Sequence, residues 1–95
     1  MPRQPPLSRD DAETLALQAL AHVAADQAAL DRLLALTGLA PDQLRARAAD
    51  PAVLAGVLDY LLGSETDLLA FCSAMNIDPA LPARARRLLP GHMGP

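Results

Sequence analysis

Hydrophobic residues recur at intervals of three and four along most of the chain, a spacing that places them on one face of an α-helix. The first such run follows Ser8, whose hydroxyl can accept a hydrogen bond from the backbone N–H of Asp11. An acid at Asp11 completes the pattern of a capping box. The sequence therefore predicts a first helix from Ser8 to about Ala25, with apolar positions at Ala12, Leu15, Ala16, Ala19, Leu20 and Val23.

Capping residues and prolines between the apolar runs predict where the later helices begin and end. Asp26 is the expected N-cap of a second helix, and Gly38 is its expected left-handed end. Pro41 and Pro51 suit the first position of a helix, because the N–H that proline lacks has no helical partner there. The further helices are expected from Pro41 to before Pro51, over 51–62, over 64–75, and from 78 to near 89 with a break at Pro82.

The same signals set the expected architecture. Ser64 and Asp67 form another capping-box pair, and Asn76 can take the left-handed position that ends the helix they open. We expect an all-α fold, a compact bundle of five or six short helices joined by tight Gly/Asn and Pro corners. The expected organisation is a disordered tail over 1–7, one helical domain over 8–89 and a loose C-terminal tail over 90–95.

Composition supports this fold class. Ala and Leu supply 39 of the 95 residues, whereas Val, Ile and Thr together supply seven. Ala and Leu lose little on entering a helix, while sheets favour β-branched and aromatic residues. The composition thus argues against a β-sandwich or a dinucleotide-binding α/β unit.

Charge and cysteine usage narrow the expected partners and location. The net charge is −3, all eight basic residues are Arg, and residues 79–95 hold three Arg and no acid. An acidic body repels phosphate backbones, which disfavours nucleic acid as a partner. The single Cys72 cannot form an internal disulfide. The N-terminal residues have no apolar stretch of signal-peptide type, and no apolar run is long enough for a membrane span. We expect a cytoplasmic protein with no membrane contact.

The segment 51–62 is the most apolar of the chain, with Asp59 as its single charge. A helix this apolar is either central in the bundle or faces a partner. A domain this small covers such a helix only with difficulty, so we predict a partner surface, with central burial as the competing alternative. The candidate interface holds Val53, Val57, Tyr60 and Leu61, and a homodimer is the simplest assembly. Tyr60 is expected at the edge of the core with its hydroxyl in water, and Gly56 is expected to admit another helix at close range.

Few residues are candidates for catalysis, metal binding or DNA binding. His22 has Asp26 four residues away but no ligand cluster around it, and Cys72 lies among apolar neighbours at helical spacing. A ligand carrier or enzyme with a pocket near these two residues is the least favoured hypothesis. Arg45 and Arg47, after the Gly38 corner, resemble the second helix of a helix-turn-helix, which makes a DNA-binding regulator the main alternative. We expect no catalytic residue, cofactor or metal, and predict a non-enzymatic protein-interaction module.

Several strings also resemble a family filed as domain of unknown function 3572, typical of alphaproteobacteria. They are the run 12–20, the 33–39 corner, the segments 44–50 and 58–62, and the string Leu69-Ala-Phe-Cys72. The resemblance spans about residues 10–90. It implies a small all-helical cytoplasmic protein and no established activity, cofactor or catalytic residue.

Overall fold

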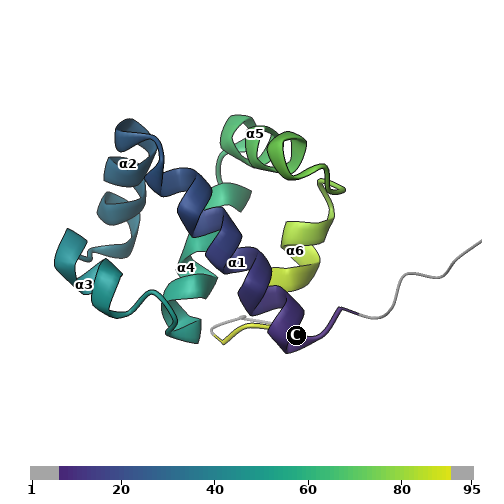
Figure 1. The fold of residues 1–95 in the computed structure, drawn as a ribbon, viewed down its shortest axis with the longest axis horizontal. Helices are drawn as coiled ribbons and strands as arrows, with labels where there is room; N and C mark the ends of the chain where they lie inside the picture. Colours follow the sequence, from purple (N-terminus) through teal and green to yellow (C-terminus); the bar gives the residue numbers. More distant parts are fainter. Residues whose placement is uncertain (1–6, 91–95) are drawn as a thin grey trace, which may run out of the picture.

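The computed structural model describes residues 7–90, which form six α-helices and no strand (Figure 1). The prediction of an all-α bundle is confirmed. The helices are α1 (Arg9–Ala24), α2 (Gln27–Thr37), α3 (Pro41–Ala46), α4 (Pro51–Leu62), α5 (Glu65–Met75) and α6 (Leu81–Arg86).

Most of the expected helix ends are present. The backbone N–H of Asp11 donates to Ser8 Oγ at 3.0 Å, and the Ser8 N–H donates to the Asp11 carboxylate at 3.1 Å, which completes the capping box. Asp26 accepts from the N–H of Ala28 at 3.1 Å. Gly38 and Asn76 both adopt left-handed backbone conformations, with φ of 73° and 55°. Local hydrogen bonds therefore set these corners as predicted.

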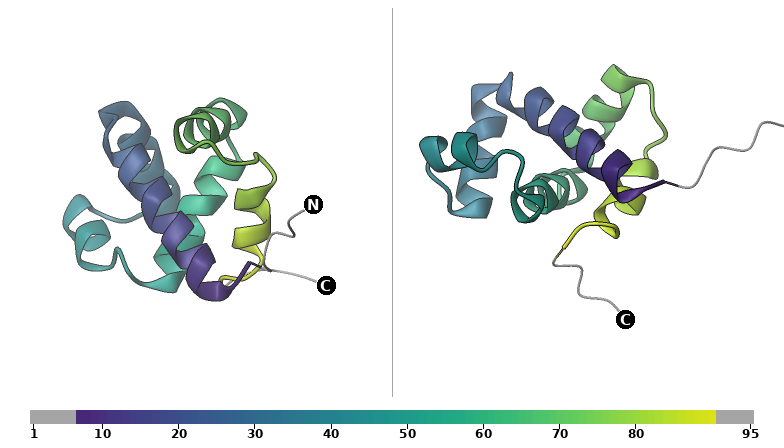
Figure 2. Two further views of the ribbon diagram at one scale, coloured as in Figure 1. Left: turned by 45° about the vertical axis from the view of Figure 1, so that its right-hand side comes forward. Right: turned by 60° about the horizontal axis from the view of Figure 1, so that its bottom comes forward.

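Helix α4 occupies the centre of the molecule. It packs against α1, α2, α5 and α6, with α1 crossing in front of it, α2 and α3 on one side, and α5 and α6 on the other (Figures 1 and 2). The core residues that α4 contributes are Val53, Leu54, Ala55, Val57, Leu58, Tyr60 and Leu61.

This position corrects the candidate interface. Val53, Val57, Tyr60 and Leu61 are all at most 7% exposed within a single chain, so they form no surface on which a partner could dock. Central burial, the alternative that the sequence left open, describes this helix. The reason is geometric, because the other helices together supply enough apolar surface to cover nearly the whole circumference of α4.

Two short helices also differ from expectation. Helix α3 ends at Ala46, so Arg47 lies at its end and is not within it. Helix α6 begins at Leu81 and not at Asp78, and Pro82 sits in its first turn, where proline is tolerated, so it does not break the helix. Asp78 accepts from the N–H of Ala80 at 2.8 Å and closes the turn before α6.

Gly56 does not admit another helix backbone. The nearest atom to a Cβ placed there is the Thr37 side-chain methyl, at 3.4 Å. Leu7, which was assigned to the N-terminal tail, packs against the core. The rest of the two expected tails lies outside the described residues, apart from the exposed Pro90. Among residues 7–90, no helix has the length and apolar character needed to cross a membrane.

Candidate interaction site

An apolar groove lies where α1, α2 and α3 meet. Its volume is about 270 Å³, and apolar side chains dominate its surface, with one arginine at its rim. The groove exists because α3 is anchored by one buried side chain, Leu44, and packs only sparsely against the rest of the molecule. The residues lining it are Leu20, Ala24, Leu30, Pro41, Leu44, Arg45 and Ala48.

The apolar surface continues from the groove along α1. Leu17 is 43% exposed and lies three residues before Leu20 and seven before Ala24. Residues at these spacings share one face of a helix. A protruding leucine and an apolar hollow therefore lie side by side on one helix. No local sequence pattern indicates this surface, because its lining residues come from α1, α2, α3 and the turn after α3.

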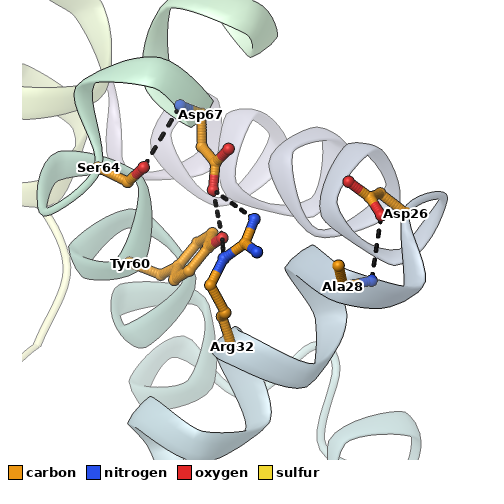
Figure 3. A network of polar contacts seen from close by, with 6 residues as sticks. All are labelled: Asp26, Ala28, Arg32, Tyr60, Ser64 and Asp67. Carbon is orange, nitrogen blue, oxygen red and sulfur yellow. Dashed lines mark hydrogen bonds and ion pairs between the residues drawn. The ribbon is translucent and has the colours of Figure 1, made fainter.

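A polar network joins α2, α4 and α5 (Figure 3). The Tyr60 hydroxyl donates to the Asp67 carboxylate and accepts from Arg32 Nε at 3.1 Å. Arg32 Nη2 also lies 3.5 Å from Asp67 Oδ2. The expectation that the Tyr60 hydroxyl reaches water is therefore corrected, since two charged side chains from other helices hold it.

This network holds each group in its ordinary protonation state at neutral pH. Burial and the bond to Asp67 raise the pKa of the Tyr60 phenol. The hydrogen bond from Tyr60, aided by the charge of Arg32, lowers the pKa of Asp67. A neutral phenol, a carboxylate and a guanidinium satisfy one another's hydrogen bonds, as in a structural link between helices.

An open hollow of about 330 Å³ adjoins this network. Its lining residues are Arg32, Leu36, Asp59, Tyr60, Gly63 and Ser64.

A second tie fastens α6 and the chain after it. Arg86 donates to both carboxylate oxygens of Asp59, at 2.7 and 3.3 Å, and its side chain is 12% exposed. Its Nη1 donates to the carbonyl oxygens of Leu89 and Pro90, at 3.4 and 3.1 Å. One guanidinium thus joins α4, α6 and the segment that follows α6.

The residues of the DNA-binding hypothesis lie near local carboxylates. Arg45 lies 3.9 Å from Asp42, and Arg47 lies 2.9 Å from Asp50. Helix α3 has six residues, of which Arg45 is one. Each arginine thus has an acid three residues away, which offsets its positive charge toward phosphates.

Cys72 belongs to the buried core, and His22 packs beside it. The His22 and Phe71 rings pack edge to face, with their centroids 5.5 Å apart and an angle of 61° between the ring planes. Cys72 is 2% exposed, and burial raises the pKa of its thiol, which favours the unreactive protonated form. Both side chains therefore have packing roles in the structure.

The described part of the chain holds no group of three or more His, Cys, Asp and Glu side chains arranged to bind a metal ion. Fold and surface together define a small all-helical protein with an apolar groove beside a six-residue helix. A family model described as Protein of unknown function (DUF3572) matches residues 9–92, so the chain belongs to that family, as its helix strings indicated. No curated protein and no solved structure matches the chain.

Proposed function

We propose that this protein is a non-enzymatic protein-interaction module that pairs with a second copy of itself through the α1–α2–α3 groove. The carrying observation is the combination of an open apolar groove and the exposed Leu17 on the same face of α1. The protonation states of the Arg32–Tyr60–Asp67 network and the burial of Cys72 support a role without catalysis.

The geometry suits a two-fold pair. In such a pair one patch meets the same patch on the other copy, so a protruding group and the hollow that receives it must lie on one surface. Leu17 and Ala24 are seven residues apart, which is about 10 Å along a helix. Two copies crossing at α1 can therefore each place Leu17 in the groove of the other.

The expected pair is reversible. Burying a leucine side chain contributes about 1.5–3 kcal/mol, and two such contacts must offset the loss of translational and rotational freedom on association. The lining surface of the groove is far smaller than the roughly 800 Å² of surface that each partner buries in a standard interface. Dissociation within the micromolar to millimolar concentration range follows from these magnitudes.

Light scattering over that concentration range tests the proposal. The mean mass should rise from one chain toward two as the concentration increases. Leu17→Asp should remain a single chain throughout, because a buried carboxylate opposes the contact. Leu69→Asp is the matched control, because Leu69 is 46% exposed on α5, away from the groove.

The results that would contradict the proposal are specific. A wild-type protein that stays a single chain at every concentration has no self-association to explain. A Leu69→Asp variant that loses the pair while Leu17→Asp keeps it would place the contact on α5. Circular dichroism of both variants establishes that each remains helical.

We further propose a cytoplasmic location for the protein. The free, buried thiol of Cys72 supports this proposal.

A further inference from the structure

The three arginines at the end of α6, namely Arg84, Arg86 and the C-cap residue Arg87, have different surroundings. Arg86 faces inward and binds Asp59. Among the seven arginines of residues 7–90, five form ion pairs, and the two that form none within that range are Arg84 and Arg87. Both are exposed, so each presents a guanidinium that has no ion-pair partner within the described residues.

These two arginines border a hollow that also has apolar walls. The hollow has a volume of about 330 Å³ and is lined by Leu7, Arg84, Arg87 and Leu88. Leu88 is 38% exposed, and Leu7 is partly buried against the core. Guanidinium groups and leucine side chains are therefore combined on one surface, here called the α6 face and defined by these four residues.

We infer that the α6 face binds an acidic segment of another protein, one in which carboxylates alternate with apolar side chains. Guanidinium groups bind carboxylates through paired hydrogen bonds. Leu7 and Leu88 offer contact to the apolar side chains between those carboxylates. Asp59 offsets the charge of Arg86, so Arg84 and Arg87 supply +2 at this face, whereas the rest of the chain carries a net charge of −5 (−3 − 2), and an acidic ligand is attracted to this face and repelled elsewhere.

The same observations disfavour nucleic acid as the ligand. A phosphate backbone offers no apolar group to Leu7 and Leu88, and two arginines neutralise few phosphates. The acidic remainder of the molecule would face the neighbouring phosphates of any long strand. A short acidic peptide avoids this repulsion because it does not extend beyond the α6 face to the acidic parts of the surface.

The experiment measures fluorescence anisotropy of a labelled eight-residue peptide that alternates Asp and Leu. The wild-type protein should bind it at low salt, and binding should weaken as the salt concentration rises. The double variant Arg84→Gln with Arg87→Gln should bind about tenfold more weakly, since two exposed ion pairs are lost. A peptide alternating Asp and Ser should also bind more weakly, because it lacks the apolar contacts.

The matched control is the double variant Arg45→Gln with Arg47→Gln. It changes the net charge by the same amount but at α3, which lies on the opposite side of the molecule from α6 (Figure 1). It should bind the Asp–Leu peptide nearly as well as the wild type. Equal losses in the two double variants would show a net-charge effect and would overturn the inference.

Two further outcomes would also overturn it. One is the absence of peptide binding at low salt, and the other is tighter binding of a labelled oligonucleotide that Arg84 and Arg87 control. This inference extends the proposed interaction role to a second face and does not depend on pairing through the groove. Light scattering of Leu17→Asp and peptide binding by the same variant therefore test the two proposals separately.

Discussion

Helices α3 and α4 both begin with proline at their first position, but they have opposite places in the structure. Helix α4 has seven buried residues out of twelve and lies at the centre, whereas α3 buries Leu44 alone. The ion pairs at α3 are local, with Arg45 paired to Asp42 within the helix and Arg47 paired to Asp50 just after it. The charged and polar groups of α4 reach other helices, with Tyr60 meeting α2 and α5, and Asp59 meeting α6.

This contrast shows that a shared start signal determines where a helix begins and has no influence on where it packs. The apolar circumference of α4 requires cover from several helices, and those helices surround it. Helix α3 buries a single side chain, Leu44, which leaves the groove beside it open. The same sparse packing that weakens α3 thus provides the surface of the proposed pair.

The largest expected difference concerns the buried leucines of the two helices. Leu61→Ala in α4 should lower the free energy of unfolding by about 3–5 kcal/mol, because Leu61 is fully buried and its neighbours cannot collapse into the cavity. Leu44→Ala in α3 should cost about 2 kcal/mol, near the low end for such changes, because it borders an open groove. Urea denaturation measures both, and equal losses would refute the contrast.

The next prediction concerns the hydrogen bonds between Arg86 and Asp59, which join α6 to α4. Arg86→Ala removes the hydrogen bonds to Asp59 and to two backbone carbonyls and should cost about 2 kcal/mol. Arg47→Ala, which removes a local pair beside α3, should cost much less. Hydrogen exchange of the α6 amides should rise in Arg86→Ala. Unchanged exchange there would mean that the guanidinium does not hold α6.

A smaller effect is expected from the hydrogen bond between Tyr60 and Asp67, whose contribution to stability depends on pH. Tyr60→Phe should lower stability at pH 7 by about 1 kcal/mol. The pKa of Asp67 is lowered in the folded protein, mainly by the Tyr60 hydroxyl. Its stabilisation is therefore complete above the ordinary carboxyl pKa of about 4 and is lost as the pH falls through the lowered folded value.

Urea denaturation between pH 7 and pH 3 measures this difference. The wild type should lose more stability toward low pH than Tyr60→Phe, so the two curves should converge. Asp11 and Asp50, whose pKa values are also lowered, are present in both proteins and contribute equally to both. Curves that stay parallel would show that the hydroxyl does not stabilise the Asp67 carboxylate.

The smallest expected effects have opposite signs at two glycines. Gly56→Ala in α4 should raise stability by about 0.5–1 kcal/mol, since alanine favours a helix and the Thr37 methyl at 3.4 Å can shift slightly. Gly38→Ala, in the corner before α3, should lower it by about 1 kcal/mol because φ is 73° there. Thermal denaturation compares them, and a loss in Gly56→Ala would show that α2 packs too tightly to adjust.

The start of α5 shows where prediction from sequence stops. Ser64 caps the helix as predicted, since it accepts from the Asp67 N–H at 3.4 Å. The Asp67 side chain, however, does not complete the capping box and instead binds Tyr60 and Arg32. Arg32 is 35 residues from Asp67 in the chain, so no local pattern indicates this choice.

Local sequence is enough to predict the all-helical class, the corners at Gly38 and Asn76, and most helix starts, since these depend on hydrogen bonds between residues within about four positions of one another. The tertiary structure alone decided that α4 is central, that Arg86 turns inward while Arg84 and Arg87 remain exposed, and that a groove opens beside α3. These features depend on which surfaces cover one another, and burial is a property of the whole assembly of helices.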